Sequence, residues 1–152
     1  MSTLSLKDII KPEIVKLNVD AKDPIEAMRI AGKILVEQGI VEPEYVDGMI
    51  KMYQTFGSYI VIAPGVAIPH ARPEDGAKKV GLAIVTLSHP VEFGNPENDP
   101  VKICIAFASP DKSQHIKILA GIAKLLQCKE DVDAIAKAQT PEEVIKILEK
   151  YE

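Results

Sequence analysis

Hydrophobic residues along the chain recur at two different spacings, and these spacings predict the regular elements. Residues 23–40 carry apolar side chains three or four positions apart, which is typical of one buried helix face. Asp23 and Pro24 fit the N-cap and the first helical position of this segment, and Gly39 fits its end. The same signals predict further helices over residues 43–56, 111–127, 131–138 and 140–150.

Capping-box pairs support the starts of three of these helices. In such a box the cap side chain accepts the N–H of the third helical residue, whose own side chain returns the bond. The expected pairs are Asp23 with Glu26, Asp111 with Gln114, and Thr140 with Glu143.

Three apolar runs predict β-strands at residues 59–63, 80–88 and 101–108. The last two are apolar on both faces, as in strands of a sheet that is covered on each side. Residues 89–100 are rich in Pro, Gly and Asn and predict a loop, with His89 in a turn at the strand end. Because strands alternate with helices and no linker interrupts them, we expect one α/β domain over residues 1–152.

Charge and composition exclude several classes of function. The formal net charge is −4, and the sequence has no basic cluster with interleaved aromatics, which argues against nucleic acid as a partner. Residues 1–13 lack the features of a secretory signal, and no apolar run approaches the length of about 18 residues that suggests a membrane span. We therefore expect a cytoplasmic protein. Cys104 lies in an apolar run and is expected to be a buried thiol.

Metal and cofactor motifs are absent from the sequence. The three histidines, His70, His89 and His115, are far apart and form neither HxH nor HExxH. Glu97 and Asp99 lack the alternating oxygen ligands of a calcium loop. The sequence contains neither GxGxxG nor a P-loop, so we expect no metal and no cofactor.

The stretch GVAIPHARPEDG, residues 65–76, presents His70 between restrictive neighbours. Gly65 allows conformations that are closed to other residues, and Pro69 fixes its own φ. An imidazole near neutral pH is a nucleophile and a proton carrier, and an arginine such as Arg72 can bind a phosphoryl group through two N–H donors. The pair suits transient phosphorylation, although PHAR alone is also compatible with a loop histidine beside an unrelated arginine.

A second histidine, His115, lies in the first turns of the helix predicted over residues 111–127. A helix N-terminus has unpaired N–H groups and the positive end of the dipole, so it attracts anions. If this end faces His70, then His115 and the amides can steady a phosphoryl group; otherwise His115 is a solvated helical residue.

Other residues near the loop are expected to be structural. We expect Glu74 and Asp75 to be solubilising loop residues. Three apolar residues could form a docking patch, but burial in the core is favoured for Val66, Ile68 and Phe93.

Residues 63–93, APGVAIPHARPEDGAKKVGLAIVTLSHPVEF, and 98–126, NDPVKICIAFASPDKSQHIKILAGIAKLL, together resemble a known family. They look like enzyme IIA of the bacterial phosphoenolpyruvate-dependent sugar phosphotransferase system, in its mannitol/fructose class. The PHARPE loop and the NDP strand entry look most like the L-ascorbate branch. The resemblance covers nearly the whole chain and implies a mixed β-sheet flanked by helices on both sides.

The resemblance also implies a phosphotransferase mechanism. Phosphorylated HPr would dock and transfer its phosphoryl group to His70, which would pass it to a cysteine of a IIB component and so to a sugar crossing the membrane through IIC. His115 matches the family's second, supporting histidine. A regulatory paralogue that binds proteins according to its phosphorylation state is the alternative. The sequence leaves the sugar and the oligomeric state, a homodimer included, open.

One feature departs from the mannitol class. Its members carry an arginine upstream of the active histidine, at the distance where Tyr53, Gln54 and Thr55 stand here. The anion-binding role of that arginine is therefore either missing or taken over by Arg72, and the departure favours the ascorbate-like branch.

Overall fold

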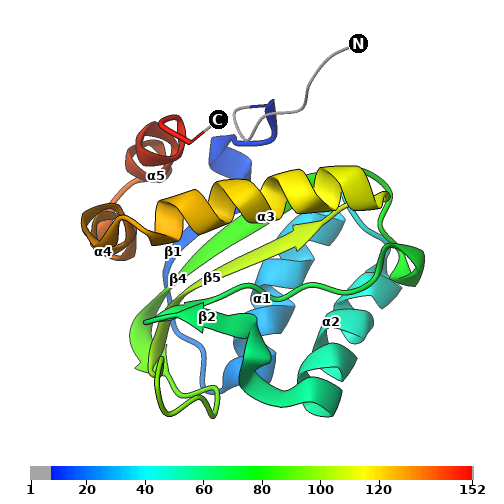
Figure 1. Cartoon of the computed structure of the whole chain (residues 1–152), viewed down its shortest axis with the longest axis horizontal. Helices are drawn as coiled ribbons and strands as arrows, with labels where there is room; N and C mark the ends of the chain where they lie inside the picture. Colours follow the sequence, from blue (N-terminus) through cyan, green and yellow to red (C-terminus); the bar gives the residue numbers. More distant parts are fainter. Residues whose placement is uncertain (1–7, 152) are drawn as a thin grey trace.

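The computed structural model describes residues 8–151, in which a mixed five-stranded sheet forms the centre (Figure 1). Across the sheet lie β1 (Val15–Val19), β4 (Gly81–Val91), β5 (Val101–Ala108), β3 (Val66–Ala67) and β2 (Val61–Ala63). β1 runs parallel to β4, and β3 runs parallel to β5. β4 is antiparallel to β5, and β2 is antiparallel to β3. The mixed sheet that the family resemblance implied is thereby confirmed.

Helices cover both faces of this sheet. They are α1 (Pro24–Glu37), α2 (Pro43–Phe56), α3 (Lys112–Leu126), α4 (Lys129–Lys137) and α5 (Pro141–Leu148). α1 packs against β4 and β5, and α2 packs against α1. Figure 1 shows α3 crossing the opposite face of the sheet from α1. The layered α/β/α arrangement agrees with the sequence prediction.

Side-chain caps fix the starts of three helices where the sequence placed them. Asp23 and Asp111 accept the N–H of the third helical residue at 2.8 Å in each case, and Thr140 does so at 3.3 Å. Glu143 returns the bond to Thr140 and completes that box, whereas Glu26 accepts from the N–H of Lys22. Each such cap stabilises its helix by about 1 kcal/mol.

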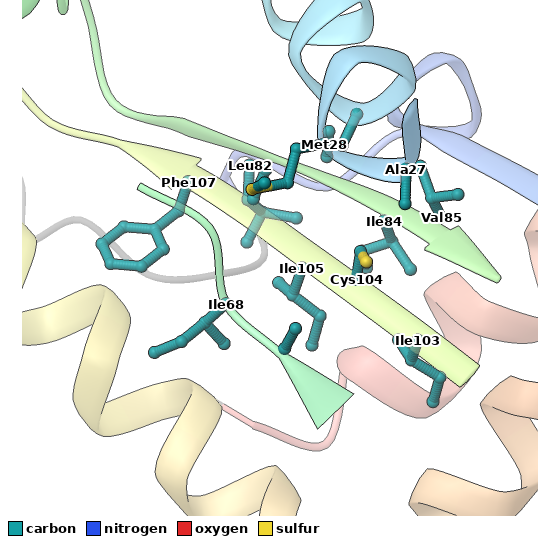
Figure 2. Close-up of a cluster of buried hydrophobic side chains, with 14 of the residues drawn as sticks. Ala27, Met28, Ile68, Leu82, Ile84, Val85, Ile103, Cys104, Ile105 and Phe107 are labelled. Atoms are coloured by element: carbon teal, nitrogen blue, oxygen red, sulfur yellow. The ribbon is translucent and has the colours of Figure 1, made fainter. Parts of the chain in front are cut away.

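The core lies on both sides of β4 and β5. Figure 2 shows Ala27 and Met28 of α1 on one side of these strands and Ile103 and Ile105 on the other. Cys104 is fully buried, and burial raises its pKa to about 12, so the expected buried thiol is confirmed. Burial in the core is likewise confirmed for Val66, Ile68 and Phe93.

Two strands escaped the sequence prediction, and two predictions were wrong. The strand expected over residues 59–63 begins only at Val61, because Gly57–Ile60 form the 3-10 helix η3. β1 and β3 are short, at five and two residues, and sit beside longer apolar strands. The expectation of a turn at His89 was wrong, because β4 continues to Val91, which pairs with Val101. The ladder is irregular between Thr86 and Val91, and such a place tolerates a proline without an N–H.

Over residues 8–151, no helix combines the length and the apolar character that crossing a bilayer requires. The expectation about a secretory signal concerned residues 1–13, of which residues 1–7 lie outside the described part of the chain.

Candidate functional site

The loop that carries His70 is tied to the sheet. Gly65 has a φ of 79°, a left-handed conformation that favours glycine, and its carbonyl accepts the N–H groups of Lys102 and Ile103. After β3, the chain continues alongside β5, where the N–H of Phe107 donates to the carbonyl of Pro69 at 3.2 Å. His70 therefore lies on an extension of the sheet, which holds its backbone.

The ring of His70 is fixed by one hydrogen bond and by ring contacts. Its Nδ1 lies 2.8 Å from the carbonyl oxygen of Ile68, so Nδ1 carries the proton and donates. The ring stacks on Phe107 at a centroid distance of 4.8 Å and an interplanar angle of 28°. Tyr59 contacts it edge-on at 6.3 Å. The remaining nitrogen, Nε2, keeps a lone pair.

Burial lowers the pKa of His70, and this effect outweighs the hydrogen bond to Ile68, which raises it. The neighbouring His115 lowers the pKa further. A pKa below the ordinary value near 6.5 keeps the imidazole neutral at neutral pH. The side chain is therefore a nucleophile in its resting state.

His115 approaches His70 from the start of α3. The two ring centroids lie 5.7 Å apart at an interplanar angle of 71°, and the centroid of Phe107 lies 5.0 Å from that of His115. Burial lowers the pKa of His115 as well. The supporting role expected for His115 required that it face His70. The structure brings the two imidazoles together, and both contact the ring of Phe107.

A pocket of about 360 Å³ adjoins both histidines. Its lining residues are His70, Ala71, Arg72, Pro73, Lys112, His115, Ile116 and Met52. Two of these side chains are cationic, and none of the described lining residues carries a carboxylate. In a chain with a net charge of −4, this concentration of positive charge and imidazole suits an anion.

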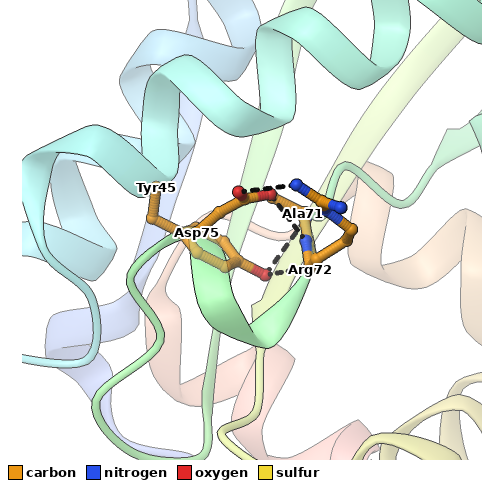
Figure 3. A network of polar contacts seen from close by, with 4 residues as sticks. All are labelled: Tyr45, Ala71, Arg72 and Asp75. Carbon is orange, nitrogen blue, oxygen red and sulfur yellow. Dashed lines mark hydrogen bonds and ion pairs between the residues drawn. The ribbon is translucent and has the colours of Figure 1, made fainter.

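Arg72 lies at the rim of this pocket rather than inside it. Its side chain is 66% exposed and forms an ion pair with Asp75 at 3.4 Å. Asp75 also accepts the backbone N–H of Arg72 at 3.1 Å, at the start of the 3-10 helix η4 (Pro73–Asp75) (Figure 3). The expectation that Asp75 only solubilises the loop was wrong, because it holds the arginine and its backbone.

Sequence reasoning missed three residues of this site. Tyr45 of α2 accepts the N–H of Ala71 and donates to the carbonyl of Phe107, but the pattern of residues 43–56 predicted only a helix and marked no residue in it. Phe107 carried no signal that separates it from other apolar strand residues. Lys112 could not be recognised from the sequence, because a lysine is not one of the residues that mark a helix start. A cation there opposes the helix dipole.

The other predicted candidates lie elsewhere. His89 is an exposed residue of β4 and does not line the pocket. Within residues 8–151, the structure brings together no group of three or more His, Cys, Asp or Glu side chains that could hold a metal ion.

Comparisons with known proteins agree with this fold. The model of the family described as phosphoenolpyruvate-dependent sugar phosphotransferase system, EIIA 2, matches residues 8–151. An ascorbate-specific PTS system EIIA component from Escherichia coli (strain K12) is 36% identical over 149 residues, which cover 97% of each chain.

Two solved structures from Escherichia coli are also similar. The mannitol-specific cryptic phosphotransferase enzyme IIA CmtB superposes with a TM-score of 0.86 and 28% identity, over 97% of this chain and 99% of that chain. Enzyme IIAMTL, in its complex with phosphorylated enzyme IIBMTL, matches with a TM-score of 0.82 and 27% identity, over 93% of this chain and 97% of that chain.

Proposed function

Because the chain belongs to the EIIA 2 family of the phosphoenolpyruvate-dependent sugar phosphotransferase system, we propose that His70 is its phosphoryl carrier. Members of this family are phosphotransferases with a phosphocarrier role in sugar uptake. The observation that carries the proposal is the bond from Nδ1 of His70 to the Ile68 carbonyl. It leaves Nε2 as the nucleophilic atom of a neutral imidazole beside a cationic pocket.

Each transfer exchanges one bond to phosphorus for another. Nε2 of His70 attacks the phosphoryl group of phosphorylated HPr, the new N–P bond forms, and the donor imidazole leaves with its electron pair. A cysteine thiolate of IIB then attacks the same phosphorus, and His70 leaves as a neutral imidazole. The sugar receives the group from IIB while crossing through IIC. A lowered pKa suits both steps, because His70 enters and leaves uncharged.

The pocket supplies a moderate anchor for the phosphoryl group. A phosphoryl group carries a charge of roughly −1.5 to −2 at neutral pH. Arg72 offers a planar pair of N–H donors, Lys112 a point charge, and His115 an imidazole beside the reacting ring. A carrier must release the group again, so a partly exposed anchor suits it better than a buried one.

Exposed apolar side chains around the pocket suit the docking of HPr and IIB. Phe56 is 62% exposed, Tyr59 46% and Ile116 65%. Tyr59 contacts His70 and Phe56, and Ile116 lines the pocket, so these three side chains form an apolar rim beside the reacting ring. Since both partners must bring a reactive atom to Nε2, we propose that they use this same rim in turn. The structural relative bound to phosphorylated enzyme IIBMTL supports IIB as the acceptor.

We propose that the sugar is of the L-ascorbate type. Identity is 36% to the ascorbate-specific component but 27% to 28% to the mannitol-specific ones. No arginine other than Arg72 lines the pocket among the residues described, and Met52 lies on its α2 side. We further propose that residues 1–152 form a single EIIA domain that works in the cytoplasm, where it meets HPr.

Intact-protein mass spectrometry tests the carrier residue. The chain is incubated with phosphoenolpyruvate, enzyme I and HPr, as wild type and as His70→Ala, with His89→Ala as the matched control. We expect one acid-labile phosphoryl adduct on wild type and on His89→Ala, and none on His70→Ala. An unchanged adduct on His70→Ala would overturn the assignment, as would no adduct on wild type while HPr is phosphorylated.

The acceptor is tested by adding a purified IIB component to the phosphorylated chain. Transfer to an ascorbate-class IIB, faster than to a mannitol-class IIB, is the expected result. If the phosphorylated chain gives its phosphoryl group to neither, the regulatory alternative replaces sugar transport.

The supporting role of His115 is tested by His115→Ala. This variant is expected to fold and to accept the phosphoryl group more slowly, and an unchanged rate would refute the supporting role.

A further inference from the structure

The hydrogen-bond ladder between β5 and the His70 loop is interrupted next to His70. In a parallel ladder, the N–H of a residue donates to the carbonyl of the residue just before the one opposite it. Its carbonyl accepts the N–H of the residue just after the one opposite it. The N–H of Phe107 donates to the carbonyl of Pro69 at 3.2 Å, which makes His70 the residue opposite Phe107. The regular continuation would be a direct bond from the N–H of Ala71 to the carbonyl of Phe107.

The hydroxyl of Tyr45 takes the place of that direct bond. It accepts the N–H of Ala71 at 3.0 Å and lies 2.9 Å from the carbonyl oxygen of Phe107 (Figure 3 shows its approach to Ala71). The carbonyl of Ala71, at 3.2 Å, is a more distant acceptor, and the hydroxyl has a single proton to donate. Two hydrogen bonds in series therefore replace one ladder bond, with the hydroxyl between β5 and the loop.

Tyr45 is well suited to hold this position. The residue is 1% exposed, and burial raises its pKa to about 12, so the hydroxyl keeps the proton that it donates. Without the hydroxyl, the N–H of Ala71 and the carbonyl of Phe107 would be unpaired in the interior, or the two segments would have to move together. Either change would affect Ala71 and Phe107, which both adjoin His70.

We propose that Tyr45 is a positioning residue for phosphoryl transfer. Its hydroxyl lies between the backbones of Ala71 and Phe107, keeps them apart and so fixes the position of the His70 ring. The ring of Phe107 stacks on that of His70, and Ala71 is the next residue after His70 in the chain. The hydroxyl therefore holds the backbones of the two residues that fix where the His70 ring lies. The inference rests on the proposed role of His70 and adds a residue of α2 that does not line the pocket.

The test is Tyr45→Phe, which removes one oxygen, with Tyr53→Phe as the matched control. Tyr53 lies on the same helix and donates to a backbone carbonyl, that of Phe93, at 2.6 Å, outside the pocket. We expect Tyr45→Phe to lower the rate of transfer from saturating phosphorylated HPr by about tenfold or more, since displacements near 1 Å can cost about a hundredfold. The HPr concentration for half-maximal rate stays unchanged, because the exposed rim is intact.

A spectroscopic readout separates positioning from loss of stability. Nitrogen-15 NMR of the His70 ring, recorded on protein shown to be folded, reports the proton on Nδ1 and the pKa. We expect both to shift in Tyr45→Phe and to stay as in wild type in Tyr53→Phe. Equal rates and ring spectra in wild type and Tyr45→Phe would overturn the inference, as would equal losses in both variants.

Two further observations keep the outcomes distinct. If Tyr45→Phe does not fold, amide exchange in wild type decides, because the inference requires the N–H of Ala71 to be protected like a ladder amide. Exchange of Ala71 at the rate of an open loop would refute it. If wild type accepts no phosphoryl group, the proposed function fails, and the ring spectra still test the role of Tyr45.

Discussion

Replacing Phe107 by leucine tests whether its ring governs the chemistry of His70. Phe107 is fully buried at the end of β5 and contacts the rings of His70 and His115 at 4.8 and 5.0 Å. Leucine keeps an apolar side chain there but removes the flat ring that contacts both imidazoles. We expect a moderate loss of stability together with a change in the pKa of His70.

The size of each effect follows from these contacts. Removing a large buried ring costs about 3–5 kcal/mol when alanine replaces it, so leucine should cost about 1–3 kcal/mol. This is small against a typical stability of about 5–15 kcal/mol, so the variant should fold. A lost ring contact of about 0.5–1.5 kcal/mol corresponds to a transfer rate roughly 2- to 13-fold lower. Because burial lowers the pKa of His70, entry of water should raise it.

Phe93→Leu provides the matched control for these measurements. Phe93 is also buried, and its ring contacts Tyr53 at 5.7 Å, but among the described residues no ring contact joins it to either histidine. Urea unfolding should show comparable losses of stability in both variants. An NMR titration of His70 and the rate of transfer from phosphorylated HPr should change only in Phe107→Leu. Equal changes in both variants, or none in Phe107→Leu, would refute the reasoning.

Two further predictions concern charge. Arg72→Ala should slow transfer with little loss of stability, because its ion pair with Asp75 is exposed, and Arg72→Lys should restore only part of the rate; full rescue by lysine would argue against two-donor recognition. The lowered pKa of His70 makes the unfolded chain bind a proton more readily than the folded one. Its contribution to stability is therefore complete above about pH 6.5 and is lost as the pH falls further. Urea unfolding at pH 7.5 and 5.5 should show a larger loss in wild type than in His70→Gln, and equal losses would contradict the pKa direction.

Local signals in the sequence determined the helices and the chemistry of the loop. The caps Asp23, Asp111 and Thr140 act over three or four residues, so their sequence spacing is enough to place a helix start. The neighbourhood of His70 and Arg72 was also visible, because they are two positions apart. Strand prediction worked for β4 and β5, whose apolar runs are long.

The tertiary structure decided whatever depends on pairing between distant segments. β1 and β3 are strands because β4 and β5 offer them hydrogen-bond partners, and five and two residues carry little signal of their own. β4 likewise extends past the expected turn at His89 because Val91 finds Val101. A sequence pattern cannot show such partners, since strand preference reflects the neighbours that the fold supplies.

The candidate site divides in the same way. The sequence alone determined that an imidazole and a guanidinium share a stiff loop, and that a second histidine follows a helix cap. Only the fold placed the ring centroid of His115 5.7 Å from that of His70 and brought Phe107 against both rings. Only the fold placed the hydroxyl of Tyr45 between Ala71 and Phe107. These residues come from α2, the loop, β5 and α3, and they meet where the loop runs alongside the end of β5.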